Sequence, residues 1–165
     1  VVPFPADRRP TVATPTFTPR SITPSGSSTL PISGTGTTAP GNYTVTSTGT
    51  SGGTQHTVTA NLAITGFTLT IAPSSQKVTK GQSVSYTATV TALNGFSATE
   101  TMSVTGLPTG ATAKFTPSSI TGSGTTTLLV TTSTSTAIGT YTLTVKATST
   151  TGSLYHTVLA PLSVQ

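Results

Sequence analysis

Apolar and polar residues alternate with a period of two along much of the chain, a pattern that predicts β-strands. In the C-terminal part, the alternating runs cover residues 67–71, 84–90, 102–104, 128–130, 141–145 and 158–164. Turn signals such as Asn94-Gly95 and Gly122-Ser-Gly124 separate them, and no helical periodicity competes. Six or seven short strands with this spacing predict a β-sandwich.

An internal repeat divides the chain. Residues 17–30 align with residues 115–128 at an offset of 98, and Gly41-Asn-Tyr43 aligns with Gly139-Thr-Tyr141 at the same offset. After a two-residue shift, residues 56–64 align with residues 156–164. Residues 66–114 have no upstream counterpart. The repeat predicts a Pro- and Arg-bearing arm over 1–16, the second half of a sandwich over 17–65, and a complete sandwich over 66–165.

Tyr43 and Tyr141 lie at the start of equivalent strands, where the pattern Gly-x-Tyr predicts a tyrosine corner. In such a corner, the hydroxyl group bonds back to nearby backbone and fixes the crossover between sheets. These two tyrosines are our predicted structural residues.

The order of motifs resembles the immunoglobulin-like repeats found in tandem in bacterial secreted and cell-surface proteins. The residues that carry the resemblance are Pro73-Ser-Ser-Gln76, Gly81-Gln-Ser-Val84-Ser-Tyr86, Leu93-Asn-Gly95-Phe96, Leu107-Pro-Thr-Gly110-Ala111, Phe115-Thr-Pro117 and Gly139-Thr-Tyr141. The resemblance implies an all-β, immunoglobulin-like β-sandwich, with one complete unit preceded by a half unit. It leaves the activity open, because such repeats serve as spacers, stalks, adhesive modules and polymer subunits.

A half sandwich leaves apolar side chains without cover. Five such side chains, at about 1.5–3 kcal/mol each, approach the 5–15 kcal/mol that stabilises a typical domain. We therefore predict that the half unit is a contact surface for assembly. The predicted assembly residues are Val12, Leu30, Val45, Val58, Leu62 and Ile64.

Three explanations for the missing half stay open at this point. Residues 1–16 or the second sandwich cover the face, another chain completes it by strand addition, or the chain is a window from a longer tandem array. Pro3, Pro5, Pro10 and Pro15 disfavour the first, because proline donates no ladder hydrogen bond. Our hypothesis is strand complementation or tight packing between chains, with a protein partner or a homo-polymer.

Composition narrows the function classes. The net charge of +5 comes from seven scattered Lys and Arg residues set against Asp7 and Glu100, which does not favour nucleic-acid binding. Cysteine is absent, which excludes a disulfide framework and a thiol nucleophile. Threonine forms about a quarter of the chain, as is typical of secreted proteins. No apolar run approaches about eighteen residues, so we expect no membrane insertion and expect any leader or anchor to lie outside the sequence.

Candidate chemistry is sparse. Acid–base pairs, glycosidase dyads and calcium sites need clustered carboxylates, and Asp7 and Glu100 lie far apart in sequence. His56 and His156 occupy equivalent repeat positions, which favours a partly buried structural role. We expect a surface ion pair between Glu100 and Lys146, on strands that such a sandwich places side by side. We predict no catalytic residue, no cofactor and no metal.

A surface glycan stays open as a ligand. Tryptophan is absent, so the aromatic platforms of carbohydrate-binding modules are not evident. Asn42-Tyr43-Thr44 satisfies the N-glycosylation pattern, but it adjoins the predicted corner and we expect it to be unoccupied.

These observations predict a non-catalytic structural segment of a secreted or cell-surface protein, assembled in a fibre, stalk, sheath or multichain complex. The alternative is a spacer or a ligand-binding accessory module, for carbohydrate or adhesion, at the tail of a larger secreted hydrolase or adhesin.

Overall fold

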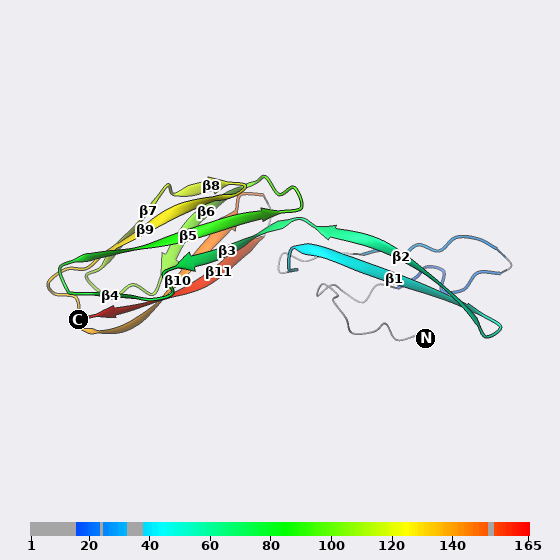
Figure 1. The fold of residues 1–165 in the computed structure, drawn as a ribbon, viewed down its shortest axis with the longest axis horizontal. Helices are drawn as coiled ribbons and strands as arrows, with labels where there is room; N and C mark the ends of the chain where they lie inside the picture. Colours follow the sequence, from blue (N-terminus) through cyan, green and yellow to red (C-terminus); the bar gives the residue numbers. More distant parts are fainter. Residues whose placement is uncertain (1–15, 24, 33–37, 152–153) are drawn as a thin grey trace. The chain divides into compact units, whose positions relative to one another are not determined.

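The computed structural model describes residues 16–23, 25–32, 38–151 and 154–165 of the chain. It contains two compact units, residues 1–65 (unit 1) and residues 66–165 (unit 2). All regular secondary structure in the described ranges is β-strand (Figure 1). The predicted all-β class is therefore confirmed.

Unit 1 is built around one long β-hairpin. Strand β1 (Gly41–Ser51) pairs antiparallel with β2 (Thr54–Ile64) along its whole length. The turn is Gly52-Gly53, and both residues have positive φ angles, 55° and 87°. A two-residue turn with two positive φ angles matches the twist of antiparallel strands, and glycine adopts it without a steric penalty.

Unit 2 is a sandwich of two sheets. One sheet has the strand order β4-β11-β10-β6-β8 and the other the order β3-β5-β9-β7. The strands are β3 (Gly66–Ala72), β4 (Gln76–Val78), β5 (Ser83–Leu93), β6 (Thr99–Thr105), β7 (Thr112–Thr116), β8 (Ser119–Thr121), β9 (Gly124–Thr131), β10 (Gly139–Ser149) and β11 (Tyr155–Val164). This arrangement is consistent with an immunoglobulin-like sandwich.

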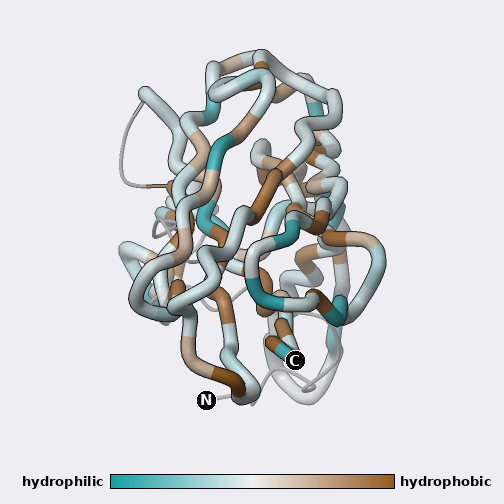
Figure 2. Tube along the Cα trace, turned by 90° about the vertical axis from the view of Figure 1, so that its left-hand side faces the viewer, coloured by the Kyte–Doolittle hydropathy of each residue, from teal (hydrophilic) through white to brown (hydrophobic). Residues whose placement is uncertain are grey.

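The alternating pattern places the core of unit 2 between its two sheets. Hydrophobic residues occur as short stretches between polar ones along the chain (Figure 2). The fully buried members of the main cluster come from both sheets, and include Leu128, Val130, Leu143, Val145, Ala160 and Leu162. Because side chains in a strand point alternately to opposite faces, every second residue reaches this core.

Tyr86 joins the two sheets of unit 2. It lies on β5 and is 1% exposed, and its hydroxyl group donates a hydrogen bond to the carbonyl oxygen of Pro161 on β11, at 2.6 Å. Burial raises the pKa of Tyr86 to about 12. The first part of the unit is thus tied to its last strand by a buried polar contact.

The six strands predicted in the C-terminal part are present, with three more that the pattern did not predict: β4, β7 and β8. These have three to five residues each. Strands of this length hold too few residues for a period of two to stand out. The strand expected before the hairpin in residues 17–65 is reduced to an isolated bridge between Thr18 and Thr29 in the described residues.

Candidate functional site

The β1–β2 hairpin of unit 1 has the same register as the β10–β11 hairpin of unit 2. Gly41 is paired with Ile64 in unit 1, and Gly139 with Val164 in unit 2. The side chains that reach the core from β10 and β11 therefore have counterparts on one face of β1–β2. We call it the hairpin face, formed by Tyr43, Val45, Ser47, His56, Val58, Ala60, Leu62 and Ile64.

The two hairpins differ in how far solvent reaches this face. In unit 2, four of the equivalent side chains are 0% exposed: Leu143, Val145, Ala160 and Leu162. On the hairpin face, Val58 is 67% exposed and Ala60 is also exposed. The other predicted assembly residues of unit 1 are half-buried: Leu30, Val45, Leu62 and Ile64. Val12 lies outside the described residues.

Residues 16–32 keep the local contacts of the repeat. Thr18 and Thr29 form an antiparallel bridge, and the Ser28 hydroxyl donates a hydrogen bond to the Pro19 carbonyl oxygen at 2.6 Å. Their counterparts, 98 residues further on, make the same two contacts, the Thr116–Thr127 pair and the Thr126–Pro117 hydrogen bond. The local structure of a second half is therefore present in both units.

Both tyrosines make the backbone contact that defines a tyrosine corner. The Tyr43 hydroxyl donates to the carbonyl oxygen of Ala39 at 2.8 Å, and the Tyr141 hydroxyl donates to that of Ala137 at 3.0 Å. The equivalent contacts span four residues in each unit, so both hydrogen bonds join residues that are close in sequence.

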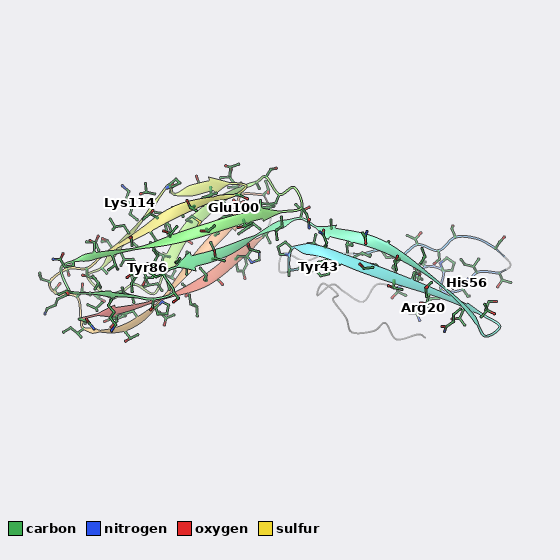
Figure 3. The ribbon with its side chains drawn as sticks, viewed as in Figure 1. Arg20, Tyr43, His56, Tyr86, Glu100 and Lys114 are labelled. Carbon is green, nitrogen blue, oxygen red and sulfur yellow. The ribbon has the colours of Figure 1, made fainter. Side chains whose placement is uncertain are left out.

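A groove of about 840 Å³ lies in unit 1, between residues 17–28 and the turn end of the hairpin. Its lining includes Phe17, Arg20 and Ile22 on one side and Gly49 and His56 on the other. Figure 3 shows Arg20 and His56 near the turn of the hairpin. Sequence reasoning missed this groove, although the repeat aligns Ile22 with Ile120, a buried residue of unit 2.

Strand β1 has one paired edge in the part of unit 1 that the structure describes, the edge against β2. Its counterpart β10 is paired on both sides, with β11 and with β6. The contacts with β6 run along Thr144–Ser149 of β10. The corresponding edge of β1, residues 46–51, has the geometry to accept a further strand.

The two histidines have different surroundings. His156 packs edge-on against Phe67, with 4.8 Å between ring centroids, and its buried Nε2 atom has no hydrogen-bond partner in the described part of the chain. Burial lowers the pKa of His156. His56 is exposed. The expected partly buried position thus holds for His156 and was wrong for His56, because Phe67 comes from the half of the repeat that unit 1 does not contain.

Glu100 is buried, and the expected surface ion pair with Lys146 was wrong. Glu100 is 0% exposed, and neither carboxyl oxygen has a hydrogen-bond partner among the described residues. Burial raises the pKa of this carboxyl group, and the nearby N–H of Glu100 offsets only part of that effect. The Lys146 ammonium instead lies 4.1 Å from the ring centroid of Tyr155. Glu100 lies two residues before Met102 on β6, so both side chains point to the same face, and Met102 packs against the core. Lys146 is paired with Ser103, whose side chain points to the opposite, outer face.

No group of three or more metal-ligating side chains occurs in the described ranges. The same residues include no helix with the length and apolarity needed to cross a membrane. Asn42, the residue to which a glycan is attached in the Asn-x-Thr pattern, is exposed on β1.

No family model matches the sequence, and no curated protein matches it. The structure is similar to solved structures of the S-layer protein SbsC. Against SbsC domains 4 and 5, it has 22% identity and a TM-score of 0.46, over 77% of this chain and 66% of that one. Against SbsC domains 4–9, the identity is 22% and the TM-score is 0.46, over 84% of this chain and 19% of that one. Against the rSbsC(31-844) structure, the identity is 23% and the TM-score is 0.45, over 87% of this chain and 18% of that one. The chain thus spans about two thirds of the first structure and under a fifth of the others. At these TM-scores, the likeness does not identify a function.

Proposed function

We propose that the chain is a non-catalytic structural segment of a secreted or cell-surface protein, and that it assembles through the hairpin face of unit 1. One observation carries the proposal. The same hairpin, in the same register, is covered by the core of unit 2 but is only partly covered in unit 1.

The physical reason is the free energy of burying apolar surface. Covering an exposed side chain such as Val58 contributes about 1.5–3 kcal/mol when burial is complete, and covering a half-buried one such as Leu62 contributes less. Several such side chains lie on one face, so a polypeptide that covers them gains enough free energy to form a stable complex. Among the described residues, one edge of β1 has no partner strand, and a strand added there contributes backbone hydrogen bonds to that contact.

The mode of assembly we propose is strand complementation or sheet packing between polypeptides, in a fibre, stalk, sheath or multichain complex. A protein partner and a homo-polymer are both compatible with the exposed face. The Thr-rich composition supports an extracellular location.

The chemistry of the described residues supports a role without catalysis. Glu100 is buried, and His56 and His156 lie in different units. Neither arrangement provides an acid–base pair around a space for substrate.

A second candidate is a spacer or adhesive module, and one observation favours it. Tyr155 and Leu159, on the same face of β11, are 45% and 59% exposed, and Lys146 stacks over the Tyr155 ring. An exposed ring beside a cation is the kind of surface on which a sugar or peptide ligand can stack. This role would use unit 2 and leave unit 1 without a function.

Native mass measurement of material from its source, combined with two variants, tests the leading proposal. Val58→Asp places a charge on the hairpin face, and the matched control Thr57→Asp places one on the opposite face. We expect a defined multichain complex that Val58→Asp dissociates and Thr57→Asp does not. Assembly that is indifferent to Val58→Asp, or a monomer in native material, would contradict the proposal.

A further inference from the structure

We infer that the outer face of the β4-β11-β10-β6-β8 sheet of unit 2 binds a polysaccharide whose sugars carry carboxylate groups. In this site, the Tyr155 ring stacks on a sugar ring and the Lys146 ammonium pairs with the carboxylate of that sugar. The inference goes beyond the proposed assembly, which uses unit 1, and it gives the second candidate role a ligand class.

The outer face of this sheet presents hydroxyl groups around one aromatic ring. Because side chains in a strand alternate between faces, the residues between the buried ones of β10 and β11 point away from the core. The register gives two neighbouring rows across β6, β10 and β11: Thr101–Thr148–Tyr155 and Ser103–Lys146–Thr157. Thr148 and Lys146 are half-buried, and the other four are exposed. Serine and threonine hydroxyls donate and accept hydrogen bonds, which suits them to the hydroxyl groups of a sugar.

Tyr155 and Lys146 form the centre of the site. They are diagonal neighbours on adjacent strands, and the Lys146 ammonium lies 4.1 Å from the centroid of the ring, which belongs to a side chain that is 45% exposed. A ligand that contacts both must carry an anionic group close to an apolar surface. A uronic acid does so, because its carboxylate is attached to the sugar ring, whose C–H face packs on an aromatic ring. An acidic peptide side chain has its carboxylate at the end of a flexible chain, without a flat apolar surface beside it.

The charges of unit 2 are complementary to an acidic polymer. Residues 66–165 contain four lysines, and their single acidic side chain, Glu100, is 0% exposed. Lys77 is exposed and is paired with Ser163, which lies between two buried residues of β11, so Lys77 is on the same outer face as Lys146. A polyanion on this face is therefore attracted by lysines and meets no exposed carboxyl side chain of unit 2.

The β3-β5-β9-β7 sheet of unit 2 provides the comparison that places the site. Its outer face also carries a lysine next to an apolar side chain, since the exposed Lys114 is paired with Leu129, which is 43% exposed. In the described strands of unit 2, however, Tyr155 is the one aromatic side chain that is exposed. Both sheets therefore offer a cation, and the β4-β11-β10-β6-β8 sheet alone offers a cation beside an exposed ring.

Titration of the full chain with a hexamer of galacturonic acid, followed residue by residue with NMR, tests the inference. We expect the resonances of residues 101–105, 144–148 and 155–159 to shift and those of β7 and β9 to stay unchanged. The methyl ester of the same hexamer has the same sugars without the charges, and it should bind at least about tenfold more weakly. Added salt should weaken the binding of the acidic hexamer, because it screens charges on an exposed face.

Two pairs of matched variants separate the site from the overall charge. Tyr155→Ser and Lys146→Gln should each raise the Kd for the acidic hexamer at least about fivefold. Leu129→Ser and Lys114→Gln make comparable changes on the other sheet and should change the Kd less than about twofold. Tyr155→Phe keeps the ring and should keep the binding. Thermal unfolding checks that each variant is folded, and the resonance map of the original chain is independent of the variants.

Each outcome decides the inference. Shifts confined to the predicted face, which need the carboxylates and the Tyr155 ring, support it. It is overturned if no resonance shifts at millimolar hexamer, if Lys114→Gln weakens binding as much as Lys146→Gln, or if hexaglutamate binds as tightly as the acidic sugar. The native mass test of the hairpin face uses other residues, so a failure here leaves the proposed assembly standing.

Discussion

The β1–β2 and β10–β11 hairpins have nearly the same pattern, register and tyrosine corner, yet the apolar face of the first is only partly covered and that of the second lies in a core. The difference comes from residues distant in sequence. Strand pairing and corner contacts are made by neighbouring residues, so both second halves form them. Cover for the apolar face comes from β3–β6, which unit 2 contains and unit 1 does not. In this protein, local sequence determines the hairpin, and a separate segment determines its burial.

The largest contrast is expected from the same substitution at equivalent positions. Leu162→Ala removes a fully buried side chain, and we expect it to lower the free energy of unfolding of unit 2 by about 2–5 kcal/mol. Leu62→Ala acts on a half-buried side chain, and we expect less than about 1 kcal/mol for unit 1. Urea unfolding followed residue by residue with NMR measures both. Equal losses would show that Leu62 is already covered in the chain alone.

A second substitution should weaken the packing of the first half of unit 2 against β10. Gly106 has a φ angle of 85°, and a Cβ atom there would lie 2.4 Å from the Thr142 carbonyl oxygen. We expect Gly106→Ala to destabilise unit 2 by at least about 2 kcal/mol and to raise hydrogen exchange in β10. Gly95→Ala is the control, since Gly95 also has a positive φ angle, 78°, but no atom within 4 Å of the added Cβ. If both variants lose the same stability, close packing at Gly106 is not what holds the two halves together.

The buried carboxyl group of the first half should make the stability of unit 2 depend on pH. Burial raises the folded-state pKa of Glu100 above its unfolded value, so the folded state binds the proton more tightly. The stability gained from this protonation is complete below the unfolded pKa, about 4.3, and is lost as pH rises through the folded pKa.

Glu100→Gln removes this titration. We expect it to stabilise unit 2 by about 1–3 kcal/mol at pH 7, since a buried charge without a partner is replaced by a neutral group. Near pH 3, the variant and the original chain should have similar stability. Thermal unfolding across this pH range measures the effect. A difference that does not change with pH would place the carboxyl group in contact with water.

The smallest effect is expected to be the same in both units. Tyr43→Phe and Tyr141→Phe each remove one hydrogen bond to a carbonyl oxygen four residues upstream, and we expect each to cost about 0.5–1.5 kcal/mol. The same NMR-monitored urea unfolding measures the two losses. A clearly larger loss in unit 2 would mean that the corner depends on the covered core and is not a local feature.

Much of the fold followed from the sequence because its determinants are local. Alternation predicted the long strands, and the repeat offset predicted the paired tyrosines. Strands of three to five residues, such as β4 and β8, are too short for an alternation of apolar and polar residues to be recognised. The buried position of Glu100 was missed, although its parity with Met102 indicates an inward side chain.

The candidate site was predicted less completely. Repeat arithmetic predicted which apolar residues lack cover. Of these, Val58 is 67% exposed, whereas Leu30, Val45, Leu62 and Ile64 are half-buried. The groove beside His56 arises where residues 17–28 approach the hairpin turn. Such an approach of distant segments has no signature in a single sequence.

Residue-resolved hydrogen exchange of the full chain, in dilute solution without a partner, tests the central claim most directly. We expect amides of β10 and β11 to exchange at least about a thousandfold more slowly than those of β1 and β2, because only the β10–β11 hairpin lies within a complete sandwich. Equal protection of the two hairpins in a monomeric sample would contradict it.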